Sequence, residues 1–323
     1  MTAAPAEKTR RRWPSALAAA ASSALILALL FRLLDIDPAS LWDAWQQASP
    51  GLLVLAAVFS LGVHVATSTD KLFRVMRAAG LSITWGEVLR IRLGSGPIRL
   101  LLPVDAGDVA NILFFHRGRN MPIDSASGAI VFDRGLNLIG STFWLLAGLA
   151  LLQAESPAPR ALLFGAIGVA YAVFLYAGSI HRLVIRTAEA FHPRLGRFAR
   201  GSLSLFQKLN ARQKAFFCLY GILFQARPLV VAWLLFAAFG LQPPVGEFIA
   251  WIVLALFAGH LPTAMGMGPR EAAVVMLFAG IAPPAILLGI GLLLTLFVHA
   301  LPMAVGLPWV YWYLHKIANG TRG

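Results

Sequence analysis

Six apolar runs follow one another along this chain of 323 residues, and each is long enough to cross a bilayer as a helix. Charged residues make up 13% of the chain, against roughly 25% in typical soluble domains. Apolar core helices of a soluble protein would be shorter and fewer. The sequence therefore predicts an all-α integral membrane protein with a single polytopic domain over 1–323. Its full transmembrane helices are expected near 15–34, 51–70, 125–152, 161–179, 215–239 and 285–314.

The net charge of +13 comes from Lys and Arg residues that concentrate between the apolar runs. This placement indicates cytoplasmic loops and contact with anionic lipid headgroups rather than nucleic acid. The basic segments 1–14, 71–92 and 180–214 are expected in the cytoplasm. The loop 35–50 carries three Asp residues and no Lys or Arg, so it is expected outside. Both termini should then be cytoplasmic, with the chain in a bacterial inner membrane.

The basic N-terminus and the apolar run Ala16–Phe31 also resemble a secretory signal peptide. No convincing small-residue cleavage site follows, and the run continues into Arg32, Leu33 and Leu34. We therefore expect an uncleaved first transmembrane helix.

Two short segments, Leu102–Asp108 and Leu261–Glu271, interrupt the apolar pattern in the same way. Each combines Leu-Pro, glycine and acidic charge. In a bilayer, non-helical backbone is tolerated only where protein buries it or it lines a polar cavity. Broken segments at matching places in two halves indicate a transporter binding site. The proposed tips of the two segments are marked by Pro103, Gly107, Pro262, Gly266 and Gly268.

The loop charges give these segments opposite senses. Residues 85–117 begin and end among basic residues, so they should enter from the cytoplasm, whereas residues 246–281 follow a loop without Lys or Arg and should enter from outside. The sequence thus predicts six spans plus two opposed re-entrant helical hairpins, an inverted repeat of halves 15–179 and 215–315. Ordinary membrane prolines and glycines are one alternative. A first hairpin partly at the interface, with snorkelling arginines, is another. Those arginines are Arg90, Arg92 and Arg99.

The linker 180–214 mixes basic with apolar residues and is interrupted by Pro193 and Gly201. This composition is typical of an amphipathic helix or helix pair on the inner leaflet. A plain basic loop is the alternative.

Ionisable residues inside the expected membrane region are candidate site residues, because charge in lipid is costly. Arg134 should lie about 15 Å along its helix, near the centre of a hydrocarbon core about 30 Å thick. Arg presents planar donors that suit phosphate, so these Arg residues could hold an anionic headgroup while the carboxylates neutralise them or bind a cationic group. The simpler alternative is that the charges pair with one another and hold the fold. The candidate substrate-binding residues are Asp105, Asp108, Asp133, Arg134, Asn137, Arg227, Arg270 and Glu271.

Motifs for other chemistry are missing from the sequence, including a Walker loop, Gly-x-Ser-x-Gly and His-Glu-x-x-His. The single cysteine, Cys218, permits no internal disulfide and is interpreted as packing. His260 and His299 are also interpreted as packing, and His64 and His116 as residues near the interface. We therefore expect a transporter rather than an enzyme, with no cofactor and no metal.

The interrupted segments and the helices after them resemble the lysylphosphatidylglycerol synthase transmembrane region, a flippase-like family. The first pattern runs from Leu102-Pro103 to Asp108 and resumes at Val131-Phe132-Asp133-Arg134-Gly135-Leu136-Asn137. The second is Pro262 followed by Gly266-Met267-Gly268-Pro269-Arg270-Glu271. The resemblance covers most of the chain.

The chain departs from this family at two places. Family members often have a Glu-Arg pair and a following Asp, where this chain has Asp133, Arg134 and Asn137. Gly107-Asp108 stands where Gly-Gly-Glu or Gly-Glu is common. Either change could alter headgroup preference or remove a charge needed for coupling.

The resemblance implies lipid translocation between leaflets. In multiple-peptide-resistance factors the membrane domain is associated with flipping aminoacylated phosphatidylglycerol, and a separate soluble domain performs the aminoacyl transfer, so synthase activity is not expected here. Stand-alone relatives are linked to glycolipid, polyprenyl-phosphate and hopanoid pathways. Three hypotheses stay open: a lipid flippase or scramblase, a non-catalytic partner of a lipid-synthesis enzyme, and a headgroup transferase with Asp108 or Glu271 as general base. The expected partners are membrane lipids with anionic headgroups, a lipid-synthesis enzyme and a second copy of the chain.

Overall fold

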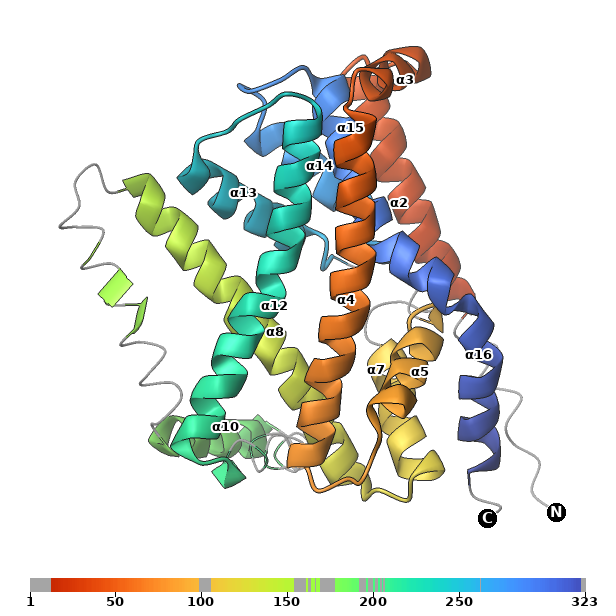
Figure 1. The fold of residues 1–323 in the computed structure, drawn as a ribbon, viewed down its shortest axis with the longest axis vertical. Coiled ribbons are helices and arrows are strands. Elements are labelled where there is room, and N and C mark those ends of the chain that lie inside the picture. The colour runs from red at the N-terminus through yellow and green to blue at the C-terminus, as the bar shows by residue number, and fades with distance from the viewer. Residues whose placement is uncertain are drawn as a thin grey trace.

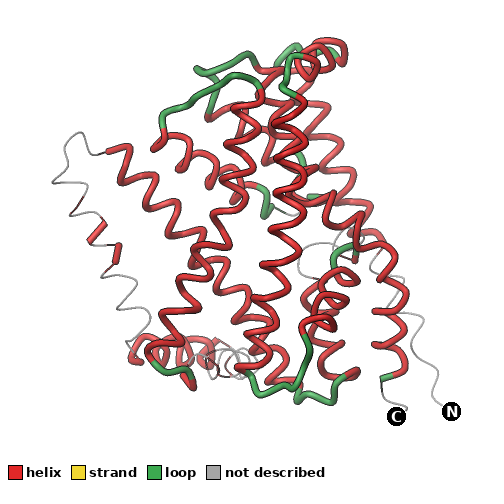
Figure 2. Tube along the Cα trace, viewed as in Figure 1, coloured by secondary structure: helices red, strands yellow, loops and turns green. Residues whose placement is uncertain are grey.

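Helices make up all the regular structure in the part of the chain that the computed structural model describes (Figure 2). The described residues are 13–98, 106–153, 161, 164–165, 167–168, 178–191, 196, 200, 203, 205, 207–261 and 263–320. Short loops join the helices, and no strand occurs among these residues. The predicted all-α class is confirmed.

In the described part of the chain, four helical stretches are long and apolar enough to cross a membrane. They are α4 (Pro50–Ala78), α8 (Ile123–Gln153), α12 (Ala211–Ala238) and the continuous stretch of α15 (Pro284–Thr295), η3 (Leu296–Ala300) and α16 (Leu301–Asn319). Each coincides with a predicted transmembrane helix. A fifth prediction, 15–34, corresponds to α2 (Trp13–Leu33), whose apolar stretch is shorter. The remaining predicted helix, 161–179, lies mostly outside the described residues.

Helix α4 continues to Ala78, past the predicted end at residue 70. The prediction ended the helix at Lys71 because of its charge, but Lys71 is 1% exposed and pairs with an acidic side chain inside the bundle. His64 was also expected near the interface. It lies instead about 21 Å along α4 from Pro50, with its ring centroid 6.4 Å from that of Phe224.

Helices α4 and α12 pack side by side in opposite directions and end in the same kind of turn (Figure 1). Gly80 and Gly240 close the two helices with φ angles of 88° and 70°. The amide of the next residue, Leu81 or Leu241, donates to the carbonyl five residues back at 3.0 and 2.9 Å. A left-handed glycine followed by this hydrogen bond is a common helix stop.

The elements that follow the two turns have the same order: a short helix, a break, a second short helix and a long helix. In the first half they are α5 (Trp85–Ser95), α7 (Ala106–Leu113) with η1 (Phe114–Gly118), and α8. In the second half they are α13 (Val245–Ala258), η2 (Ala264–Gly266), α14 (Pro269–Leu277) and α15. Figure 1 shows α5 and α7 in the half of the molecule that holds the end of α16, and α13 and α14 in the opposite half.

Two apolar clusters form the core, one around α5 and η1 and the other around α13 and α14. Helix α8 connects them, because it packs against both α12 and α13. A Cβ atom on Gly140 of α8 would lie 2.2 Å from the carbonyl oxygen of Gly221 on α12. Small residues allow this close backbone approach in membrane proteins.

Two further helices lie at the ends of the bundle. Helix α3 (Pro38–Gln46) is capped by Asp37, whose Oδ1 accepts the amide of Ser40 at 2.7 Å. Helix α10 (Gly178–Phe191) lies across the opposite end, near the start of α12 (Figure 1). It forms part of the basic linker and exposes Arg182, Leu183 and Arg186.

Candidate functional site

Asp133 on α8 is 3% exposed and is shared by two cations from other helices. Lys71 Nζ of α4 lies 3.2 Å from Asp133 Oδ1, and Arg92 Nη2 of α5 donates to Oδ2 at 2.8 Å. Lys71 also donates to Asn137 Oδ1. These four residues, which we call the Asp133 network, fasten α4 and α5 to α8. Asp133 and Asn137 were predicted site residues, and Lys71 and Arg92 were not.

The snorkelling alternative for Arg92 is wrong, because its side chain is 13% exposed and ion-paired. Lys71 and Arg92 were placed in the cytoplasmic segment 71–92 because that segment is rich in basic residues. A spacing signal was available on α4, where Ser60, His64, Thr67 and Lys71 recur every three or four residues. Such spacing puts polar side chains on one helix face.

Arg134 forms a two-point ion pair with Asp108 at the start of α7. Its Nε donates to one carboxylate oxygen, and its Nη2 donates to the other at 2.8 Å. The Arg134 side chain is 40% exposed and that of Asp108 is 13% exposed. Asn137, three residues further along α8, belongs to the Asp133 network. Gly107 lies in the first turn of α7, and Pro103 and Asp105 lie outside the described residues.

The second broken segment turns through Met265, Gly266 and Gly268, with φ angles of 55°, 71° and 99°. Glu271, fully buried, closes this turn by accepting the amide of Gly268 at 2.5 Å. Pro262, the other predicted tip residue, lies outside the described residues. A Cβ atom at Gly259 would lie 2.5 Å from Nη2 of Arg270, so glycine leaves the space that the guanidinium fills.

Thr295 of α15 joins Arg270 to Glu271. Its hydroxyl accepts from Arg270 Nη1 at 2.8 Å and donates to Glu271 Oε1 at 2.5 Å. Arg270 Nη2 also donates to the carbonyl of Met265 at 3.2 Å. All three side chains are at most 2% exposed. The predicted pair Arg270 and Glu271 is therefore brought together, with Thr295 as an unpredicted member.

The two acidic residues have matching positions in their halves. Asp108 and Glu271 are each the third residue of the second short helix, α7 or α14. Their partners Arg134 and Thr295 are each the twelfth residue of the following long helix. An acidic side chain thus ties each broken segment to the next helix in both halves.

Arg227 is on α12, on the side that faces α4, and is 7% exposed. Its Nη1 donates to Ser60 Oγ at a long 3.4 Å, its Nε is buried without a hydrogen-bond partner, and it has no acidic partner among the described residues. Ser60 Oγ in turn donates to the Phe297 carbonyl at 2.8 Å. His299, expected only to pack, has a buried Nε2 without a partner and is within electrostatic reach of Arg227 and Arg270.

These groups are suited to binding ions. The guanidinium groups of Arg134, Arg227 and Arg270 are hydrogen-bond donors suited to phosphate or carboxylate. Two of them already have internal partners that a bound anion could replace. Among the described residues, Arg227 has the weak bond to Ser60 and the Phe224 ring, whose centroid is 5.8 Å from its guanidinium carbon.

One family model covers most of the chain. The model for the "Lysylphosphatidylglycerol synthase TM region" matches residues 16–306. The chain belongs to this family. Membership in the lysylphosphatidylglycerol synthase transmembrane family makes it a multi-pass membrane protein with a lipid-related function. No curated protein matches the chain in sequence.

Proposed function

We propose that the chain moves a lipid between the leaflets of the bacterial inner membrane, as a flippase or scramblase. The headgroup is anionic or aminoacylated, on a phospholipid, a polyprenyl-phosphate glycolipid or a hopanoid-type lipid. The headgroup crosses through the polar interior while the acyl chains stay in the bilayer. Family membership and the buried cations of the bundle support this proposal.

The main support for this proposal is the buried side chain of Arg227. It is about 24 Å along α12 at 1.5 Å per residue, and no carboxylate among the described residues pairs with it. A buried charge without a partner lowers the stability of a folded protein by several kcal/mol. Charges inside the membrane region commonly mark substrate pathways. A transient anionic ligand would supply the missing partner. We therefore assign the phosphate of the headgroup to Arg227 at the middle of its crossing.

In this proposal the two broken segments control access of the headgroup to the polar interior, one from each side of the membrane. In our proposal α5 and α7 form a re-entrant hairpin from the cytoplasm, and α13 and α14 form one from outside, within six transmembrane helices and with both termini cytoplasmic. The distribution of basic residues and the shared element order of the two halves support this arrangement. Discontinuous helices that meet near the midplane are typical of transporter sites.

The acidic residues then control this access of the headgroup. A phosphate that competes with Asp108 for Arg134 would loosen the first hairpin from α8. One that competes with Thr295 for Arg270 would loosen the second from α15. Loosening one hairpin at a time opens the path to one leaflet at a time.

The test is transport by the purified protein in liposomes that contain a trace of acyl-labelled fluorescent lipid. A membrane-impermeant reductant bleaches only the outer leaflet, so translocation appears as a second, protein-dependent phase. We expect this phase with phosphatidylglycerol or its lysyl derivative, and a slower one with phosphatidylcholine. If every lipid behaves as in protein-free vesicles, the transport proposal fails, and a role as a non-catalytic partner of a lipid-synthesis enzyme takes its place.

A further inference from the structure

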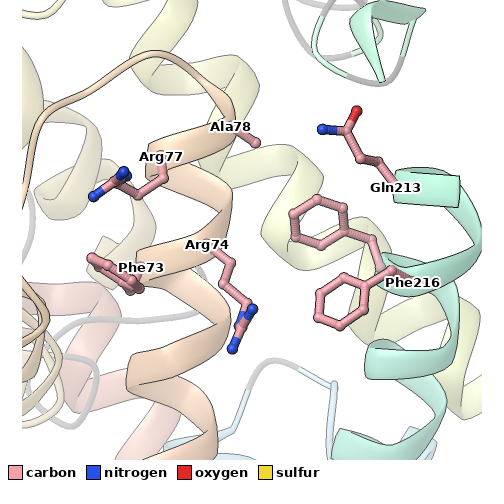
Figure 3. A pocket seen from close by; sticks show the side chains of 7 residues that line it. Phe73, Arg74, Arg77, Ala78, Gln213 and Phe216 are labelled. Carbon is pink, nitrogen blue, oxygen red and sulfur yellow. The ribbon is translucent and has the colours of Figure 1, made fainter. Parts of the chain in front are cut away.

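An open groove separates the end of α4 from the beginning of α12 (Figure 3). Its volume of about 520 Å³ is in the range of small-molecule sites, about 300–1,000 Å³. The groove is lined by Phe73, Arg74, Arg77, Ala78, Gln213, Phe216 and Phe217. Arg74 points from α4 toward Phe216 of α12, with its guanidinium carbon 5.2 Å from the ring centroid. The groove thus combines cationic and aromatic walls.

Both arginines of the groove have N–H groups without a hydrogen-bond acceptor among the described residues. Arg74 Nε bonds to Asp70 Oδ2 at 2.6 Å, while its terminal nitrogens have no hydrogen-bond partner among the described residues. Its side chain is 47% exposed. Arg77 lies near the Phe73 ring, 5.7 Å from its centroid, and has no acidic partner in the described part of the chain. These cation–π contacts do not occupy the N–H donors of either arginine. Figure 3 shows Arg74 between the two helices and Arg77 on the side of α4 that faces away from α12.

The packing interface between α4 and α12, which we call the seam, extends from this groove to Arg227. The Tyr220 hydroxyl donates to Asp70 Oδ2 at 3.0 Å, next to the groove. Further along, Lys71 Nζ lies 4.3 Å from the centroid of the Phe224 ring. Arg227 is one turn beyond Phe224. Aromatic side chains of α12 therefore face polar side chains of α4 from the groove to the proposed midpoint.

We infer that the groove is a docking site for the phosphate of an anionic glycerophospholipid, from which a headgroup enters the seam toward Arg227. The direction of transfer rests on the proposed function, whereas lipid binding at the groove does not. Two arginines against the single carboxylate of Asp70 leave the groove positive, which complements a phosphate. The exposed ring of Phe216, with Phe217 buried behind it, provides apolar contact for the glycerol backbone and the upper acyl chains.

The position of the groove supports a lipid occupant. Helix α10, with exposed Arg182 and Arg186, lies at the same end of the bundle as the start of α12 (Figure 1). A helix with basic and apolar faces is typical of a membrane surface that contains anionic lipid. The groove therefore opens at the depth where phosphates of that leaflet are expected.

Native mass spectrometry of the purified full chain, titrated with phosphatidylglycerol or phosphatidylcholine, tests this inference. We expect phosphatidylglycerol to bind more tightly, and the R74Q/R77Q variant to lose at least about tenfold in its affinity, because charge-assisted hydrogen bonds are removed. The matched control is R117Q/R212Q, which removes two exposed arginines that do not line the groove. This control should keep the preference for phosphatidylglycerol.

Three outcomes would overturn the inference: equal binding of both lipids to the native chain, an equal loss in the two double variants, or full competition by soluble glycerol phosphate. The last result would mark a site for free phosphate compounds. Liposome transport by R74Q/R77Q separates this inference from the proposed function. Normal phosphatidylglycerol binding and transport in that variant would reject the groove alone, whereas groove binding without any transport by the native chain would reject only the transport proposal.

Discussion

At the scale of single residues, the buried carboxylates each join partners from different helices. Asp133 neutralises Lys71 and Arg92 together. Glu271 accepts a backbone amide of its own turn and the hydroxyl of Thr295. Removal of one such acceptor leaves several buried donors unpaired, which costs more than the loss of one exposed ion pair.

We predict that Asp133→Asn lowers the free energy of unfolding by about 3–5 kcal/mol, because Lys71 and Arg92 then lose their counter-ion. Lys71→Met should cost clearly less, because Arg92 still neutralises Asp133. Thermal unfolding of the purified variants in one detergent gives the comparison. Equal losses in the two variants would show that the carboxylate is not the shared partner.

Sequence reasoning identified the acidic members of these clusters and missed several partners. Asp108, Asp133 and Glu271 stand out because acidic residues in apolar segments are rare. Thr295 and Ser60 do not stand out, since a hydroxyl in an apolar helix is common. Lys71 was missed because positive charge at the end of an apolar run usually marks a membrane boundary.

At the scale of elements, the second broken segment needs glycine at positions where the backbone turns sharply or where another side chain packs against it. Gly266 and Gly268 have positive φ angles, which other residues rarely adopt. Gly259 has an ordinary helical backbone, and its absent Cβ instead makes room for Arg270. The Leu-Pro and glycine pattern predicted the break, but the contact between Gly259 and Arg270 joins residues 11 apart across that break and leaves no local signal in the sequence.

Gly259→Ala should therefore displace Arg270 from Thr295, lower the unfolding free energy by about 1–3 kcal/mol and slow lipid translocation. Gly280→Ala is the control, because a Cβ there meets nothing within 4 Å. Melting temperatures and rates of lipid translocation in liposomes, measured for the two variants, test this prediction. Similar small effects from both substitutions would remove the packing argument for Gly259.

At the scale of the whole molecule, the two halves repeat one arrangement. Both contain Gly-Leu, four residues and then Gly-Glu, at Gly80–Glu87 and Gly240–Glu247. This repeat is visible in the sequence but is short, and only the matching turns and helix order give it meaning. Because α4 and α12 run in opposite directions, the two turns lie at opposite ends of the bundle.

This geometry predicts opposite accessibility for Ser82 and Gln242, each exposed two residues after its turn glycine. In a Cys218→Ser background, Ser82→Cys should react with an impermeant maleimide only in inside-out vesicles. Gln242→Cys should react only in intact spheroplasts. Labelling of both positions from the same side would exclude the inverted arrangement.

If Arg227 receives the lipid headgroup, the Arg227→Gln variant should slow phosphatidylglycerol translocation in liposomes. We predict a loss of at least about tenfold relative to the native chain, because a charge-assisted hydrogen bond to the phosphate is removed. The exposed Arg212→Gln variant should keep the native rate. A native rate in folded Arg227→Gln protein would contradict this role of Arg227.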